Sequence, residues 1–235
     1  MPPGPCGPIS AASVSKKDGG SRMLIRLDAN DERNFSRAVT GVIPSVDRAR
    51  RPAAFANRVG RIDENGVSLR PWAAERRRWI DAKDRLLSLA RVVVITDVRR
   101  CYASMAPDVV VSGLVRLGAP SDAVETIAGW LGAFQEEGIR GLPIGPTASA
   151  ILADAVLMVG DAALERMGVR HIRWVDDVAI FTEDRPAALI ALDELRSAWR
   201  SVGLESHPGK TAVLDPDEAD ARLTGTSTSG PPALR

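Results

Sequence analysis

Two adjacent carboxylates stand out in the segment from His171 to Thr182, HIRWVDDVAIFT. Asp176 and Asp177 lie between two short apolar runs that contain β-branched and aromatic residues, which predicts a β-hairpin with the acids at its tip. Neighbouring carboxylates repel each other when they lose water, and Mg²⁺ is a hard cation that prefers oxygen ligands. The pair is typical of a magnesium site, while a solvated hairpin turn would explain the same two residues without a metal.

A third carboxylate follows an apolar run farther upstream. Residues Val92 to Ile95 are all β-branched, and Thr96, Asp97 and Val98 come directly after them. This pattern predicts a buried strand that delivers Asp97 at its end, within reach of the hairpin tip. Tyr102, the only tyrosine in the chain, follows Asp97 five residues later.

Two further segments complete a pattern. GLPIGPTASAILADAVL begins at Gly141, before the hairpin, and GLESHPGKTAVL begins at Gly203, after it. The order of an Asp-to-Tyr strand, a Gly-Leu-Pro loop entering a helix, an aromatic-x-Asp-Asp hairpin and a Gly-Leu…Lys-Thr segment resembles the palm of the reverse transcriptases. The resemblance covers about residues 91–214 and is closest to the bacterial, abortive-infection-like branch, whose role is defence against phage.

The resemblance implies an α+β fold: a polymerase palm, in which an antiparallel sheet is backed by helices, with partial fingers and no evident thumb. It also implies two bound Mg²⁺ ions, or Mn²⁺ in their place. It assigns catalytic roles to Asp97, Asp176, Asp177 and Lys210, the three aspartates being the metal ligands. It assigns contacts with the incoming nucleotide to Tyr102, Gly141, Pro143, Gly145 and Ser149.

Each of these residues also has a plainer explanation. Tyr102 by resemblance excludes a ribose 2′-hydroxyl, and the plainer alternative is an ordinary half-buried aromatic at the start of a helix. Trp174 stands where the family has Tyr or Phe, and a place in the core explains it as well as contact with a primer does. Lys210, expected near the triphosphate, is a single lysine of a kind common on surfaces. Asp154 and Asp161 lie seven residues apart on one helix face, and we expect them to pair with arginines.

One departure from the family concerns Ile144, which stands where the family usually has glutamine. Glutamine can form hydrogen bonds with a nucleotide and isoleucine cannot. The abortive-infection-like branch often lacks this glutamine, so Ile144 favours that branch and argues against ordinary processive synthesis.

The composition limits which partners and which cell compartment are expected. The chain has 235 residues and a formal net charge of +1, so a nucleic-acid partner requires basic residues that are gathered locally. The two cysteines, Cys6 and Cys101, are far apart, which favours a reducing compartment. The sequence shows no signal peptide and predicts no membrane-spanning stretch. We therefore expect a cytoplasmic protein without a membrane partner.

The chain divides into four predicted parts: a disordered tail at 1–20, partial fingers with a connecting helix at 21–90, the palm at 91–214, and a disordered tail at 215–235. Helices are expected at 71–90, 106–118, 121–137, 148–167 and 185–202. Arginines of the fingers are expected to hold the triphosphate, because one guanidinium group can bind two phosphate oxygens at once. The candidates by position are Arg48, Arg50, Arg51 and Arg58. The arginine cluster at 76–78 is expected to be a solvated surface.

The predicted function is RNA-directed DNA synthesis, in which dNTPs are added to a 3′ end on an RNA template with a DNA or protein primer. Untemplated synthesis remains an alternative, and an oligomer or second subunit is expected to supply a thumb. Two other hypotheses stay open. One is a maturase like those of group II introns, and the other is an inactive or partner-dependent palm remnant that binds nucleic acid.

Overall fold

A computed structural model describes residues 4–15 and 20–226, and it divides into two compact units. One unit, called unit 1 here, contains the chain up to Arg50, then Asn57–Leu69 and Arg100–Val156. The other, unit 2, contains Arg51–Ala56, Arg70–Arg99 and the chain from Leu157 onward. Each unit combines segments of the predicted fingers and the predicted palm, and the two are described separately.

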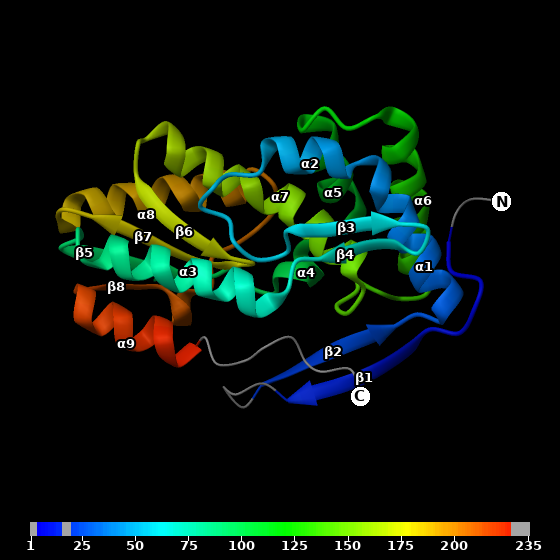
Figure 1. Cartoon of the computed structure of the whole chain (residues 1–235), viewed down its shortest axis with the longest axis horizontal. Helices are drawn as coiled ribbons and strands as arrows, with labels where there is room; N and C mark the ends of the chain where they lie inside the picture. The colour runs from blue at the N-terminus through cyan, green and yellow to red at the C-terminus, as the bar shows by residue number, and fades with distance from the viewer. Residues whose placement is uncertain (1–3, 16–19, 227–235) are drawn as a thin grey trace. The chain divides into compact units, whose positions relative to one another are not determined.

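Unit 2 is built on a four-stranded sheet (Figure 1). Its strands are β5 (Val92–Thr96), β6 (Arg170–Trp174), β7 (Asp177–Thr182) and β8 (Ala212–Leu214). They lie in the order β6-β7-β5-β8, and every neighbouring pair is antiparallel. The prediction of an antiparallel sheet with helices is confirmed.

Helices cover both faces of this sheet. On one face, Trp79 of α3 (Trp72–Leu87) and Leu223 of α9 (Pro216–Thr226) share a buried cluster with Val93 and Phe181 of the strands. The other face packs against α8 (Arg185–Arg200), which contacts β5 and β7. In Figure 1, α3 crosses in front of the sheet and α8 lies behind it. Since successive strand residues point to opposite faces, alternate positions of each strand face α3 and α8.

Unit 1 has two hairpins and several helices. The hairpins pair β1 (Ser10–Ser15) with β2 (Ser21–Arg26) and β3 (Val59–Asp63) with β4 (Gly66–Leu69). The helical elements are α1 (Ala29–Ala38), η1 (Val39–Gly41), α2 (Ile43–Ala49), α4 (Cys101–Ser104), α5 (Pro107–Arg116) and α6 (Ser121–Glu136). Phe35 of α1 packs against Trp130 and Phe134 of α6, with ring centroids 5.3 and 5.1 Å away. This aromatic cluster forms a core from residues far apart in the sequence.

Helix α7 (Thr147–Arg166) begins in unit 1 and ends in unit 2. Its 20 residues have the length and apolar composition of a membrane span, so the prediction that no stretch passes this test was wrong. However, 78% of its most apolar window is buried inside the protein, and its Asp154 and Asp161 are buried and ion-paired. These are the properties of a core helix, which passes the same test of length and composition.

Both predicted disordered tails contain regular structure, which corrects the sequence analysis. Strand β1 lies in the first tail, where the backbone N–H groups of Cys6 and Gly7 also donate to Asp31 at 2.9 and 2.8 Å. Helix α9 lies in the second tail, where Ala219 and Leu223 are buried against the sheet. The remaining parts of those predictions, at 1–3, 16–19 and 227–235, lie outside the described residues. The sequence analysis missed these two elements because their segments are polar and their stability depends on contacts with other parts of the chain.

Candidate active site

The three predicted metal ligands come together at one end of the sheet in unit 2. Asp97 follows the last residue of β5, and Asp177 is the first residue of β7. Thr96 is paired with Val178 across these antiparallel strands, so Asp97 and Asp177 occupy the next position on each. Asp176 lies in the two-residue turn that joins β6 to β7.

These carboxylates influence one another electrostatically. Desolvation raises the pKa of Asp177, and the negative charges of Asp176 and Asp97 raise it further, while Lys210 and Arg76 act in the opposite direction. Asp177 is partly exposed, so water screens some of this repulsion. The net result is a pKa of Asp177 above its usual value. Such a cluster of negative charge favours a cation.

Asp97 is the most enclosed of the three, with 3% of its surface exposed. Its Oδ2 accepts a hydrogen bond from Lys210 Nζ at 2.5 Å. Its Oδ1 is buried and has no hydrogen-bond donor among the described residues. A buried carboxylate oxygen without a donor is costly, so this atom is suited to a ligand.

Lys210 ends a short 3₁₀ helix, Pro208–Lys210. Burial tends to lower the pKa of Lys210, but the hydrogen bond and charge of Asp97, with the other two aspartates, outweigh burial and raise it. The backbone carbonyl of Lys210 accepts a hydrogen bond from Arg222 Nη2 of α9 at 2.9 Å. Helix α9 therefore helps to fix this lysine, which remains protonated beside the carboxylates.

The hairpin turn is strained. Val175, its first residue, has φ = +56°, a left-handed conformation that β-branched side chains rarely adopt and that two-residue turns usually give to glycine. The carbonyl of Val175 accepts a hydrogen bond from Arg173 Nη1 at 2.9 Å. This bond holds the turn in the conformation that presents Asp176.

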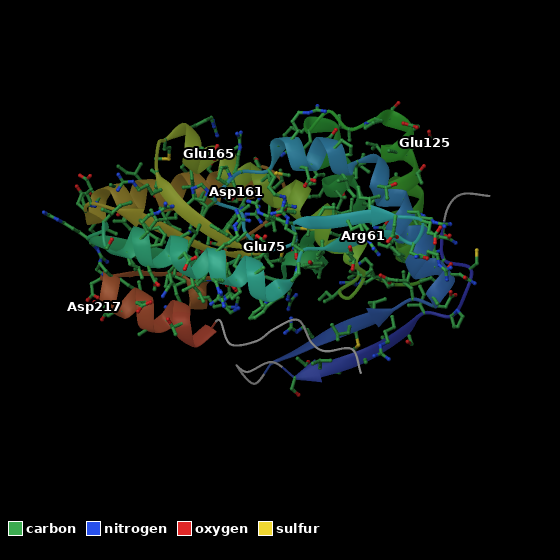
Figure 2. All side chains as sticks on the ribbon, viewed as in Figure 1. Arg61, Glu75, Glu125, Asp161, Glu165 and Asp217 are labelled. Atoms are coloured by element: carbon green, nitrogen blue, oxygen red, sulfur yellow. The ribbon has the colours of Figure 1, made fainter. Side chains whose placement is uncertain are left out.

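Arg173 is itself held by a buried carboxylate on α7. Its Nε and Nη2 donate to the two oxygens of Asp161 at 2.9 and 2.7 Å, and His171 lies 3.5 Å from the same carboxylate. Burial would raise the pKa of Asp161, but the charge of Arg173 and the adjacent His171 lower it below its usual value. Figure 2 labels Asp161 on α7. The prediction that Asp161 pairs with an arginine is confirmed.

Asp154 also pairs with an arginine as predicted, and its partner is Arg50 within unit 1. Arg51 forms an ion pair with Glu165 at 3.1 Å within unit 2. Both arginines were predicted to hold the triphosphate, and the structure instead gives them carboxylate partners in the protein. Arg48 lies at the exposed end of α2 and stays a prediction, as does Arg58.

The predicted nucleotide loop lies in unit 1 together with Tyr102. The backbone N–H of Leu142 donates to the carbonyl of Tyr102 at 2.9 Å. Gly141 has φ = +69°, and a Cβ added there would lie only 2.2 Å from the same carbonyl oxygen. Only glycine fits at this position, so the loop stays against the helix that carries Tyr102.

Close packing against the backbone also explains why the second glycine of the predicted nucleotide loop, Gly145, is a glycine. A Cβ on Gly145 would lie 2.4 Å from the carbonyl oxygen of Ile25, whose N–H donates to Ile144 at 2.7 Å. Gly145 itself is exposed, whereas Pro143 is buried and Ser149 has no exposed surface. The side chain of Ser149 is enclosed in the core of unit 1, and its contact with a nucleotide stays a prediction.

A divalent cation was predicted between the aspartates. Within residues 4–15 and 20–226, no three His, Cys, Asp or Glu side chains converge closely enough to hold one ion. The chemistry of the donor set nevertheless fits Mg²⁺, because three carboxylates lie at the same end of the sheet and Asp97 Oδ1 is buried without a donor among the described residues.

Sequence reasoning missed Arg76, which was expected on a solvated surface and is only 8% exposed. Its guanidinium stacks on Trp79 and Trp174, and it acts electrostatically on Asp177. The spacing of Trp72, Arg76 and Trp79 was the available signal, because residues three and four apart share one face of a helix. An arginine between two tryptophans on the apolar side of a helix is rarely a solvated one.

Comparisons with solved structures find telomerases of the same fold. Telomerase from Candida albicans in complex with a TWJ fragment of telomeric RNA has a TM-score of 0.56 at 12% identity, covering 96% of this chain and 42% of that one. Apo telomerase from Candida tropicalis has a TM-score of 0.57 at 11% identity, covering 90% and 44%. The chain spans less than half the length of either telomerase, and identities this low show the fold alone.

The sequence itself matches a family model over most of its length. No curated protein matches the chain. A model of the reverse transcriptase (RNA-dependent DNA polymerase) family matches residues 14–221, which include the three aspartates at the sheet end and the predicted nucleotide loop. The chain therefore belongs to the reverse transcriptase family.

Proposed function

We propose that the protein is an RNA-directed DNA polymerase that adds dNTPs to the 3′ end of a primer. The observation that carries this proposal is the sheet end where Asp97 and Asp177 occupy neighbouring strand positions, with Asp176 in the turn and Lys210 bonded to Asp97. An RNA template is supported by the family, and one of the similar telomerases is described with bound RNA.

In the proposed reaction, the 3′-hydroxyl of the primer loses its proton to water, and its oxygen bonds to the α-phosphorus of a dNTP while the bond to pyrophosphate breaks. Asp97 and Asp176, with Asp177, would hold two Mg²⁺ ions, which when bound neutralise the charge on the phosphates and activate the hydroxyl. Lys210 carries its proton at Nζ and is positioned by Asp97, so it can protonate the leaving pyrophosphate. Much of the catalysis is then electrostatic and depends on how rigidly these groups are held.

Tyr102 and its loop are proposed to bind the sugar of the incoming nucleotide. Tyr102 is half-buried, and the Gly141–Pro143 backbone is fixed against its carbonyl. Replacing its ring in Tyr102→Ala should raise the ratio of ribonucleotide to deoxynucleotide incorporation, since steric exclusion of the 2′-hydroxyl would be lost. An unchanged ratio would remove this role.

The biological role is proposed to be phage defence in the bacterial cytoplasm, on the resemblance to the abortive-infection-like branch and on Ile144. A plaque assay in cells that express the wild type or Asp176→Asn tests this role. Protection that requires Asp176 would support it, and equal plaque counts with and without the protein would contradict it.

The direct test of the proposed activity is incorporation of labelled dNTPs by purified protein with Mg²⁺, with and without an RNA template and primer. Asp176→Asn should abolish incorporation. Asp193→Asn is the matched control, because Asp193 lies on α8 with 78% of its side chain exposed. Incorporation that depends on template would select templated over untemplated synthesis. Absence of incorporation by folded wild type would favour the rival hypothesis of a palm remnant that binds nucleic acid.

A further inference from the structure

Arg76 occupies an unusual place beside the carboxylates. It lies on α3 and is 8% exposed, with its guanidinium carbon 3.9 Å from the ring centroid of Trp79 and 5.3 Å from that of Trp174. Trp174 is the last residue of β6, directly before the turn that contains Asp176. The ring of Trp72 meets that of Trp174 edge to face at 6.0 Å. We call Trp72, Trp79 and Trp174 the tryptophan cluster.

The contacts of Arg76 are incomplete for a buried cation. Its two tryptophan neighbours interact with the guanidinium through their rings, which leaves the five N–H groups at its edge. In the described part of the chain, no carboxylate or carbonyl oxygen accepts a hydrogen bond from Arg76, and no acidic side chain forms an ion pair with it. None of its nitrogens is among the buried atoms without a partner, so the donor edge is open to solvent and can meet a phosphate group, which supplies the acceptors.

The charge of Arg76 acts on the candidate active site. Arg76 stacks on Trp174, which is paired with Asp177 across the hairpin. Burial lowers the pKa of Arg76, and the negative charge of Asp177 opposes this effect. Guanidinium nevertheless remains protonated in proteins. Lys210 acts on Asp177 in the same sense, so two cations flank a cluster of carboxylates that would otherwise repel a phosphate.

We propose that Arg76 binds a phosphate group of the substrate held at these carboxylates, through the edge of its guanidinium. Planar, paired N–H donors match two phosphate oxygens, and the tryptophan cluster fixes the plane in which they point. The phosphate belongs either to a nucleic-acid strand or to a nucleotide, and the same chemistry recognises both. The naming of the ligand rests on the proposed function, while the binding of a phosphate by Arg76 is testable without catalysis.

The test measures binding by fluorescence anisotropy, using a labelled DNA primer annealed to RNA and the Asp176→Asn protein, so that no turnover occurs. Arg76→Gln should weaken binding about tenfold and reduce the slope of log K against log salt by about 0.9, as expected for one lost phosphate contact. Arg77→Gln is the matched control, because Arg77 is the next residue on α3 and is exposed. It should weaken binding less than about twofold, as a surface charge does. Equal losses in the two variants would overturn the proposal.

The same variants distinguish the two sources of phosphate. Displacement of a fluorescent dNTP analogue measures nucleotide binding in the absence of any strand. Loss of strand binding alone in Arg76→Gln assigns a phosphodiester, loss of dNTP binding alone assigns the triphosphate, and loss of neither overturns the proposal.

A conservative variant separates ligand binding from folding. Arg76→Lys keeps the charge but lacks the planar pair of donors, so it should fold like the wild type and bind several times more weakly. Binding equal to that of the wild type would overturn recognition by the guanidinium edge, whether or not Arg76→Gln folds. Because the readout is binding, a failure of dNTP incorporation would refute the proposed function and leave this result intact.

Discussion

Two buried arginines of unit 2 differ in what they bind, although one lies in the β6–β7 hairpin and the other stacks on it. All three side-chain nitrogens of Arg173 donate hydrogen bonds: Nε and Nη2 donate to Asp161, and Nη1 donates to the carbonyl of Val175. Arg76 stacks on Trp79 and Trp174 and donates to no oxygen among the described residues.

The difference separates a structural cation from a binding one. The arginine whose three nitrogens all donate to protein acceptors fixes the backbone of the turn, and a ligand would have to displace its carboxylate. The arginine with only aromatic contacts keeps its donors for a ligand. The comparison therefore predicts that Arg173 matters mainly for stability and that Arg76 matters mainly for binding.

The largest expected effect is on stability at Arg173. Arg173→Leu leaves Asp161 buried without its partner, which should lower the free energy of unfolding by about 3–5 kcal/mol. Arg76→Leu loses only stacking on tryptophan and should cost about 1–2 kcal/mol. Denaturant unfolding followed by circular dichroism measures both values.

The double variant Asp161→Leu/Arg173→Leu sharpens this comparison. Replacing both members of a buried ion pair removes the unpaired charge, so the double variant should be more stable than Arg173→Leu alone. Additive losses, or equal losses at Arg173 and Arg76, would show that Arg173 is not distinguished by its ion pair.

A second expected effect is a loss of stability at acidic pH. The folded pKa of Asp161 is lowered, so its stabilising contribution is complete above the unfolded pKa near 4 and is lost as pH falls through the folded value. The wild type should lose on the order of 2 kcal/mol more than Asp161→Asn between about pH 5 and pH 2. Unfolding free energies measured across this range test the prediction, and parallel pH profiles for the two proteins would contradict it.

The smallest effect is expected in the turn. Val175 adopts φ = +56°, which glycine adopts without steric cost. Val175→Gly should therefore stabilise the protein by about 0.5–1 kcal/mol, with the greater flexibility of the unfolded glycine chain offsetting part of the relief. A thermal melt is sufficient to measure this change. A clear loss of stability would mean that packing of the valine side chain outweighs the strain.

Local patterns were enough to predict part of this molecule. The β6–β7 hairpin was expected from two short apolar runs around Asp176 and Asp177, and both strands form in register. The pairing of Asp161 was expected from its place on an apolar helix, where a carboxylate requires a cation. Such features depend on residues close in sequence or on the general cost of burying charge.

Other features depended on residues that are distant in sequence. Arg76 is buried partly by Trp174, nearly one hundred positions away, so its arginine-rich surroundings suggested a surface. Helix α9 has only Ala219 and Leu223 as buried apolar residues, and these find their partners in the sheet. The ion pair between Arg50 and Asp154 likewise joins residues that are far apart in the sequence and that meet only through the packing of unit 1.

The most direct test of the account is dNTP incorporation by Asp97→Asn, measured beside the wild type and Asp193→Asn on an RNA template. Asp97 reaches the site from a different strand than the hairpin aspartates, and among the described residues its ion pair is with the partly exposed Lys210. We expect Asp97→Asn to lower incorporation at least about 100-fold while changing the free energy of unfolding by less than about 1 kcal/mol. Incorporation by folded Asp97→Asn at the wild-type rate would contradict the placement of the active site at this end of the sheet.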